Sequence, residues 1–392
     1  MTTTRFFPLF ALLTITLLVA GCMAPTSAPE SIQSIPQTTI PTPTQTTESQ
    51  LASEIDDFMT ALADQGRFSG SILAAKDRKV LISKGYGMAN LELEVPNTPQ
   101  TKFQLASVTK QFTAMAILQL QQQGKLNVQD PICQYLLDCP EAWQPITIHH
   151  LLTHTSGIRD YADSINVDVQ KHSLSPIELM NLIPKSVEFP AGERFHYSNS
   201  GYVILGYIIE QASGELYSIF LLKNIFQPLQ MADTGYDNTS VIIKNRADGY
   251  ISAAANAEYV NPSILYAAGG LYSTVEDLFR WDQALYGDQL LSQPLRDEMF
   301  TSFAPPLPPD YFGWRLSSDE VTDASYGYGW FVGERLNRQW TAHSGSGYGF
   351  TNVIERYPSD KVVIIVLSNR EAIPVYDITS GIARIIFGEN GK

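Results

Sequence analysis

The folded region begins with two apolar patterns of different period. Residues 51–59 place apolar side chains three and four positions apart, which indicates an amphipathic helix. Residues 70–75 and 80–86 are apolar runs joined by the charged segment 76–79, a pattern typical of a β-hairpin. We therefore expect a helix followed by two antiparallel strands at this end of the folded region.

Helical patterns dominate the middle of the chain, and strand patterns return near its end. From residue 107 to about residue 300, helical stretches are interrupted by loops such as His154-Thr155-Ser156-Gly157. A proline-rich segment, 304–309, precedes the last strand patterns, and a closing helix is expected over residues 378–386. The expected strands are residues 328–332, 339–343, 350–354 and 362–367.

These patterns predict an α+β fold, an α/β sandwich with an inserted helical part. One antiparallel sheet takes strands from both ends of the chain and is flanked by the terminal helices. Residues 51–392 exceed the length that a single hydrophobic core usually supports, so two cores are expected. We assign about residues 51–106 and 300–392 to the α/β part and about residues 107–299 to an all-α subdomain.

The first 50 residues lie outside this pattern. Arg5 precedes an apolar run, residues 6–18, which is shorter than a transmembrane helix of about 20 residues. Residues 1–21 therefore indicate an export signal. Small residues before Cys22 resemble a bacterial lipoprotein cleavage box, which would make Cys22 the lipidated N-terminus of an envelope protein held at a membrane; the alternative is an ordinary secretory signal. Residues 22–50, rich in Pro, Thr, Ser and Gln, are expected to form a disordered tether.

Charge and cysteine content narrow the classes of partner. The formal charge is −14, from 26 Lys and Arg residues against 40 Asp and Glu residues, so nucleic acid is not an expected partner. Cys133 and Cys139 flank a short loop, and in an exported protein they either form a disulfide or stay free thiols. Neither has a second pair at zinc-ligand spacing, and His149, His150 and His154 indicate loop and helix-start positions, so we expect no metal and no other cofactor.

The segment 104–118 contains the first candidate for chemistry. Its apolar residues recur at helical spacing from Phe112 onward, so a buried helix is expected to begin at Ser107. Ser107 and Lys110 share a face of that helix, which brings the lysine amine within reach of the serine hydroxyl. Free N–H groups at the helix start favour an anion at the serine and disfavour the charged form of the lysine. The two interpretations are a serine nucleophile with a lysine base, and a helix-capping serine with a solvated lysine.

Two later polar segments are candidates for the same site. Residues 195–202 contain Tyr197, which could relay a proton, and Asn199, which could orient the lysine or bind a substrate amide. Residues 343–349 end a predicted strand, where glycines let a substrate approach the backbone. Taken singly, the first segment is equally explained by a helix cap beside a core aromatic residue, and the second by a glycine-rich hairpin loop.

The three segments together resemble the serine β-lactamase and penicillin-binding protein superfamily, in particular its class C and esterase-like branch. An S-x-x-K sequence at Ser107, a Y-x-N sequence at Tyr197 and a [K/H]-[T/S]-G sequence at His343 follow one another in this order. The resemblance covers about residue 51 to the end of the chain. Stretches that look like further family landmarks are residues 151–158, 197–202 and 268–278.

The resemblance implies a β-lactamase/transpeptidase-like fold and a set of roles. Ser107 would attack a carbonyl to form an acyl-enzyme, and the backbone N–H groups of Ser107 and Ser346 would form the oxyanion hole. Lys110 and Tyr197 would share the proton transfers, either of them as general base, which requires the pKa of Lys110 to fall by about 3 units. The residues that would bind a small-molecule or peptide substrate are Asn199, His343, Ser344 and Gly345.

His343 departs from the β-lactamase pattern, in which a lysine occupies this position. In the family that lysine lies near the substrate carboxylate, so a histidine here weakens the expectation of efficient β-lactam hydrolysis. We therefore expect a serine hydrolase that acts on an ester or on an amide of a D-amino acid, as an esterase or DD-peptidase does. The alternatives are a true β-lactamase, a penicillin-binding sensor without turnover, and a pseudoenzyme or adhesin on the same fold.

Overall fold

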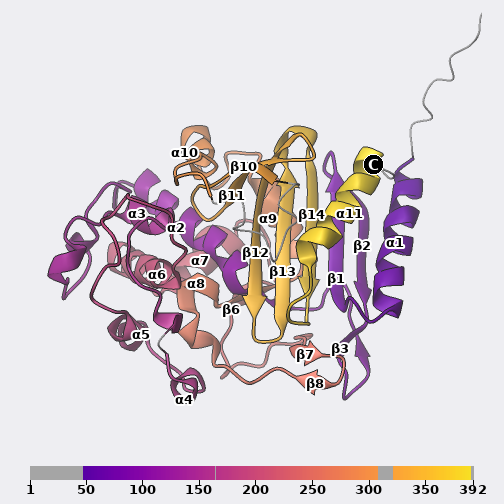
Figure 1. The fold of residues 1–392 in the computed structure, drawn as a ribbon, viewed down its shortest axis with the longest axis horizontal. Coiled ribbons are helices and arrows are strands. Elements are labelled where there is room, and N and C mark those ends of the chain that lie inside the picture. Colours follow the sequence, from indigo (N-terminus) through magenta and orange to yellow (C-terminus); the bar gives the residue numbers. More distant parts are fainter. Residues whose placement is uncertain (1–46, 164, 308–320, 390–392) are drawn as a thin grey trace, which may run out of the picture. The chain divides into compact units, whose positions relative to one another are not determined.

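The structure is a computed structural model that describes residues 47–163, 165–307 and 321–389 (Figure 1). Residues Thr46–Lys392 form one structural unit. The predicted export signal, Cys22 and the tether up to residue 46 lie outside the described residues. None of the described helices has the length and apolar character needed to cross a membrane.

A seven-stranded antiparallel sheet dominates this unit, in the order β10-β11-β12-β13-β14-β1-β2 (Figure 1). β1 lies between β2 and β14, so strands from the two ends of the chain are hydrogen-bonded neighbours, as predicted. The hairpin expected over residues 70–86 is β1 and β2. The strands of the sheet are β1 (Gly70–Lys76), β2 (Lys79–Tyr86), β10 (Val321–Tyr326), β11 (Phe331–Arg335), β12 (Arg338–Gly347), β13 (Phe350–Tyr357) and β14 (Val362–Ser368).

The interior strand β14 explains why the sequence near the C-terminus is continuously apolar. Val362 and Ile364 face one hydrophobic core. Val363 and Ile365 face the other, because successive side chains of a strand point to opposite faces of the sheet. Since both faces are covered, neither requires polar residues. The two expected cores therefore lie on the two faces of the sheet.

The terminal helices cover one face, as predicted. α1 (Glu48–Asp64) packs on β2, and α11 (Val375–Phe387) packs on α1, β13 and β14. From the inserted part of the chain, α9 (Val275–Ala284) packs on β1 and β14 and belongs to the core on the other face. The sheet is thus held between helices from both ends of the chain and a helix from its middle (Figure 1).

The inserted part is mostly helical, but it is not all-α as predicted. It contributes strands to a three-stranded sheet, β5-β9-β6, and forms the hairpin β7-β8. Strands of two or three residues are too short to show a period in the sequence.

The remaining elements of the described residues are short or lie in the inserted part. The helices are α2 (Lys110–Gln122), α3 (Ile148–Leu152), α4 (Val167–Gln170), α5 (Pro176–Leu182), α6 (Asn199–Ser213), α7 (Tyr217–Leu221), α8 (Tyr266–Gly269) and α10 (Gln293–Met299). The short strands are β3 (Met88–Asn90), β4 (Val95–Pro96), β5 (Phe103–Gln104), β6 (Gly235–Tyr236), β7 (Tyr250–Ser252), β8 (Ala255–Asn256) and β9 (Leu271–Ser273). The single turns are η1 (Ala106–Thr109), η2 (Ile132–Gln134), η3 (Glu141–Trp143), η4 (Tyr161–Asp163), η5 (Leu222–Phe226), η6 (Pro262–Ile264) and η7 (Pro358–Asp360).

Several boundaries differ from the predictions; the closing helix, for example, begins at Val375 instead of residue 378. α1 begins at Glu48 rather than at residue 51, because Thr47 and Gln50 form a reciprocal capping box that the expected tether had included. The strand expected from residue 328 begins at Phe331. The edge strand β10 was not predicted, because its register with β11 shifts around Asp323, which has a left-handed φ of 52°.

A disulfide joins Cys133 and Cys139, so the first of the two alternatives for these cysteines holds in the structure. The bond links η2, which contains Cys133, to the segment before η3. It closes a short loop within the inserted part.

Helix α2 lies at the junction between the inserted part and the sheet. All its residues from Lys110 to Leu120 are buried, so the helix is enclosed on every side. It packs on α6, α7, α8 and α10, while η1, directly before it, packs on β12 and β13. Ser107 and Lys110 therefore lie where the helices of the inserted part meet the sheet.

Candidate active site

Ser107 lies on a single 3-10 turn rather than on the first turn of the predicted α-helix. The turn η1 comprises Ala106–Thr109, and α2 begins only at Lys110. Ala106, directly before the serine, has a left-handed φ of 47°, a conformation that costs a non-glycine residue free energy. The sharp turn leaves Ser107 partly exposed on a wall of a cavity of about 200 Å³.

Lys110 is completely buried, and three oxygen atoms surround its amine. Nζ lies 3.1 Å from Ser107 Oγ, 2.8 Å from Asn199 Oδ1 and 2.9 Å from the carbonyl oxygen of Ala268. Burial lowers the pKa of Lys110 from 10.5 to about 7, against the opposing effect of the Asp160 carboxylate. The fall agrees with the shift that a lysine base requires.

The neutral amine of Lys110 fits these three partners one by one. It has two hydrogens, which Asn199 Oδ1 and Ala268 O accept, and one lone pair, which remains for the hydroxyl of Ser107. The arrangement therefore provides a proton acceptor for the serine at hydrogen-bond distance.

Asp160 orients Asn199 and was not predicted. Its Oδ2 accepts hydrogen bonds from the backbone N–H and from Nδ2 of Asn199, both at 2.8 Å. Because the backbone N–H and the side-chain Nδ2 of Asn199 both donate to Asp160, the other side-chain atom, Oδ1, is left to face Lys110. The carboxylate itself is fixed by the N–H of Ala162, which donates to Oδ1 at 2.9 Å. No local pattern in the sequence marks this aspartate.

Tyr197 lies beside the amine, with its ring between Lys110 and a buried histidine. Lys110 Nζ is 4.8 Å from the centre of the Tyr197 ring, and His154 stacks on the ring at 4.2 Å. His154 is only 1% exposed, and its Nδ1 accepts the backbone N–H of Ser198 at 3.1 Å. Burial holds the pKa of His154 well below 6.5, so this ring is neutral. The loop residue His154 thus fixes the position of Tyr197.

The C-terminal motif reaches the serine through Gly345 on β12. A Cβ atom at residue 345 would lie 2.1 Å from the carbonyl oxygen of Leu105 and 2.9 Å from the backbone nitrogen of Ser107. Only glycine therefore lets the strand lie against η1. Ser346, the next residue of β12, lines the same cavity as Ser107.

His343 and Ser344 are buried behind this strand end. His343 is 1% exposed; its Nε2 is hydrogen-bonded to the Tyr326 hydroxyl at 2.9 Å, and its Nδ1 lies 2.7 Å from Ser344 O. Its ring centre is 6.3 Å from that of Tyr197. His343 neighbours the catalytic candidates, but it does not line the cavity beside Ser107.

The walls of this cavity are mainly apolar. No Lys, Arg or His is among the described residues that line it, and Lys110 is fully buried. The polar groups that face it come from the serine, the asparagine and the end of β12. The lining residues that form its apolar side are Tyr161, Ala162, Ile165, Ile264, Leu265 and Ala268.

Known proteins are similar to this chain in both sequence and fold. The family model described as Beta-lactamase matches residues 51–383. The chain is 31% identical over 357 residues to penicillin-binding protein 4* of Bacillus subtilis, which covers 86% of this chain and 76% of that protein. It is 26% identical over 309 residues to the teichoic acid D-alanine hydrolase of Staphylococcus aureus, with 77% and 70% covered. The octameric penicillin-binding protein homologue from Pyrococcus abyssi matches with a TM-score of 0.75 at 30% identity, over 86% of this chain and 77% of that one. The resemblance drawn from the three motifs is confirmed, and the chain belongs to the beta-lactamase family of serine hydrolases.

Proposed function

We propose that the protein hydrolyses esters or D-amino-acid amides through an acyl-enzyme on Ser107. The observation that carries this proposal is the buried Lys110 amine, with its pKa lowered to about 7 and Ser107 Oγ at 3.1 Å. Lys110 takes the hydroxyl proton while the serine oxygen bonds to the carbonyl carbon. The backbone N–H groups of Ser107 and Ser346 stabilise the resulting oxyanion.

The same groups then complete the cycle. The proton returns from Lys110 to the leaving oxygen or nitrogen, with Tyr197 as the second carrier, and the carbonyl–leaving-group bond breaks. Water attacks the acyl-enzyme and gives one proton to the same pair of residues. That proton passes to Ser107 Oγ as the bond between Oγ and the acyl carbon breaks, which releases the acid and restores the serine. Asn199 holds the lysine in place and contacts the substrate from the rim of the cavity.

The cavity supports a substrate without a carboxylate beside the reacting bond. A substrate carboxylate would meet no cationic side chain among the described lining residues, and His343 has its ring nitrogens bound to protein groups. β-Lactam antibiotics carry such a carboxylate, whereas simple esters and D-alanyl esters or amides do not require one. The hydrolase from Staphylococcus aureus, named for removing D-alanine from teichoic acid, supports the same substrate class.

Parallel incubations test the proposal. A p-nitrophenyl ester, a D-alanyl ester, a D-Ala-D-Ala peptide and a penicillin are each mixed with the protein, and turnover and intact mass are followed. We expect turnover of the esters or D-alanyl substrates and an acyl adduct that Ser107→Ala abolishes. An adduct that survives in Ser107→Ala would contradict the assignment, and faster turnover of the penicillin than of every ester would make the protein a β-lactamase instead.

We also propose export and lipid attachment at Cys22, on the strength of the Val19-Ala20-Gly21-Cys22 sequence. The mature protein should then fractionate with membranes and carry acyl mass on Cys22. The mass should correspond to more than one acyl chain, because a single chain gives only marginal membrane binding. Cys22→Ser should release the protein or block its processing. A soluble mature protein with an unmodified N-terminus elsewhere would refute the attachment.

A further inference from the structure

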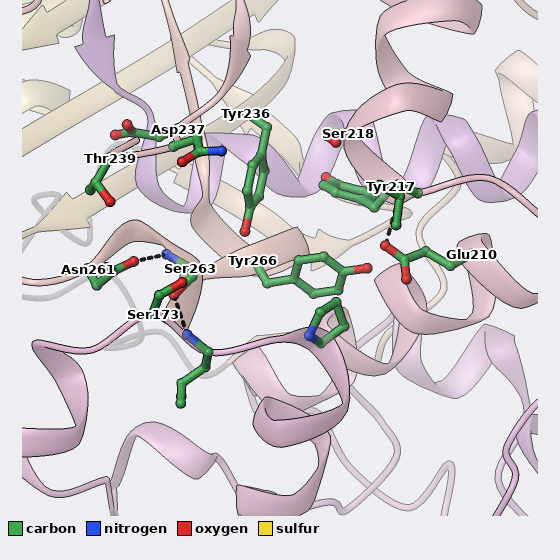
Figure 2. A pocket seen from close by; sticks show the side chains of 14 residues that line it. Ser173, Glu210, Tyr217, Ser218, Tyr236, Asp237, Thr239, Asn261, Ser263 and Tyr266 are labelled. Carbon is green, nitrogen blue, oxygen red and sulfur yellow. Dashed lines mark hydrogen bonds between the residues drawn. The ribbon is translucent and has the colours of Figure 1, made fainter. Parts of the chain in front are cut away.

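A second cavity, of about 210 Å³, lies in the inserted part of the chain (Figure 2). It shares no lining residue with the cavity beside Ser107. Its walls come from the segment before α5, from α6 and α7, from β6 and the loop after it, and from η6 and α8. The chemistry of the proposed hydrolase uses none of these side chains.

Three tyrosine rings form one side of this second cavity. The rings of Tyr217, Tyr236 and Tyr266 lie 5.1 to 6.3 Å apart, centre to centre, and are tilted or edge-on to one another. Figure 2 shows the three grouped together, with the hydroxyl of Tyr266 directed toward Glu210. Of the three rings, only that of Tyr236 is partly exposed. In the described part of the chain, no Lys or Arg side chain lies over any of these rings.

The charge in this second cavity is negative. Its charged lining residues are Glu210 and Asp237, and no Lys, Arg or His is among the residues that line it. Asp237 already accepts hydrogen bonds from Arg246 and Gln104, each at 2.8 Å. Glu210 accepts the backbone N–H of Tyr217 at 2.9 Å and has no ion-pair partner among the described residues. Burial raises the pKa of Tyr236 and Tyr266, and the charge of Glu210 adds to both shifts.

We propose that this second cavity is a binding site for a small organic ammonium ion. The charge of such an ion would be attracted by Glu210, and its carbon atoms would lie against the partly exposed ring of Tyr236, whose face carries negative electrostatic potential. Tyr217 and Tyr266 are buried and pack against this ring. An anion would meet the Glu210 carboxylate and no cationic side chain among the lining residues, because Arg246 is already paired with Asp237. A neutral molecule of the same shape would gain only the apolar contact, so the charge itself should decide recognition.

The second cavity is connected to the catalytic lysine by a short path. Tyr266 begins α8, and the carbonyl oxygen of Ala268 in the same helix accepts the Lys110 amine. The hydroxyl of Tyr217 is hydrogen-bonded at 2.8 Å to Thr113, which lies on α2 with Lys110 and also donates to Ala267 O at 2.7 Å. An ion in this cavity therefore lies next to α8 and is linked to α2 through the Tyr217–Thr113 hydrogen bond, and these are the two helices that hold the lysine.

Binding is tested with choline and with 3,3-dimethyl-1-butanol, which has the same shape without the charge. Calorimetric titration should give choline a dissociation constant at least about tenfold lower than that of the alcohol, as a carboxylate with aromatic faces provides. Glu210→Gln should remove this difference, and it keeps an oxygen to accept the N–H of Tyr217. Tyr236→Leu should weaken the binding of choline and leave the binding of the uncharged alcohol unchanged. Glu215→Gln, on the neighbouring turn and paired with Lys223 outside the cavity, is the matched control and should bind choline as the parent does.

The experiment separates this site from the proposed active site. Choline should bind equally to the parent, to Ser107→Ala and to protein acylated at Ser107, so the result does not depend on the hydrolase chemistry. Equal affinity for choline and the alcohol, no binding of either at concentrations of about 50 mM, well above weak cation–π affinities, or loss of choline binding on acylation would each overturn the proposal.

Discussion

At the scale of single residues, the proposed acylation depends on the buried amine of Lys110, whose two hydrogens in the neutral form are hydrogen-bonded to Asn199 and Ala268. Protonation of Lys110 would fill the lone pair that faces Ser107, so only the neutral form can take the serine proton. Because the pKa of Lys110 is about 7, we expect kcat/KM for a neutral ester to fall about tenfold per pH unit below pH 7 and to level off above it. A pH–rate profile with a p-nitrophenyl ester measures this. A profile that is flat through neutral pH would exclude Lys110 as the base.

The same lowered pKa makes a prediction about stability. The unfolded lysine keeps its pKa of 10.5, so between the two values the unfolded state binds more protons and the free energy of unfolding rises with pH. Lys110→Met lacks this contribution. From pH 7 to pH 9 the stability of the parent should therefore gain about 2 kcal/mol relative to Lys110→Met, measured by denaturant unfolding. A difference that stays constant with pH would mean that the buried amine keeps its ordinary pKa.

Asp160 should act on rate and on pH dependence together. Its carboxylate holds Asn199 by two hydrogen bonds and raises the pKa of Lys110 against the effect of burial. Asp160→Asn should lower kcat by roughly tenfold or more, as loss of a positioning group does, and should move the acid limb of the pH–rate profile to lower pH. The exposed Asp163→Asn is the control. An unchanged limb in Asp160→Asn would show that the carboxylate does not act on the lysine.

The sequence predicted the reacting residues better than the residues that hold them. Ser107, Lys110, Tyr197 and Asn199 occur in ordered short motifs, and the structure brings all four together. Asp160 was missed because it acts across 39 positions on Asn199 from a loop without periodicity. The expected role of His343 in carboxylate binding stays a prediction, made from a chain pattern that carries no information on which way a strand side chain is buried.

At the scale of elements, the close approach of β12 to η1 is the contact expected to set the geometry of the proposed oxyanion hole. Gly345→Ala would place a Cβ atom 2.1 Å from Leu105 O, so either the strand or the turn must move. We expect a loss of about 1–3 kcal/mol in the free energy of unfolding, from overpacking, and a loss of acylation even in the folded fraction. Gly287→Ala, where a Cβ atom meets open space, should change neither. Normal acylation kinetics in Gly345→Ala would show that η1 tolerates displacement.

Elements were predictable where a period could repeat. The strands β1, β2, β13 and β14 and the helices α1 and α11 extend over enough residues for alternation or helical spacing to appear. The edge strand β10 is bent at Asp323, and β6, β7 and β9 have two or three residues each, so tertiary hydrogen bonds rather than local sequence define them. The disulfide between Cys133 and Cys139 likewise required the fold, because spacing alone allowed both alternatives.

At the scale of the whole molecule, the sequence division into an α/β part and a helical part is not a division of the packing. Residues of the inserted helices and the inner face of the sheet belong to one core, and the other core lies between the sheet and the terminal helices. Pairing of β1 with β14 also makes the two chain ends depend on each other. The described unit should therefore unfold as one cooperative system.

The ion pair of Asp282 on α9 and Arg356 on β13 tests this cooperativity, because it joins the inserted part to the sheet where both side chains are almost completely buried. Removing one partner leaves the other charge buried and unpaired, so Asp282→Asn should cost about 3–5 kcal/mol. The double variant Asp282→Leu/Arg356→Met should cost less than that single variant, since no charge is left unpaired. Glu48→Gln, which breaks an exposed pair with Lys79, should leave stability nearly unchanged.

Because one core spans the inserted part and the sheet, circular dichroism and tryptophan fluorescence should report a single transition that moves to lower denaturant in Asp282→Asn. If the two signals separated in that variant, the inserted part would be able to unfold while the sheet remained folded, and the ion pair would be a link between two independent units rather than a contact within one.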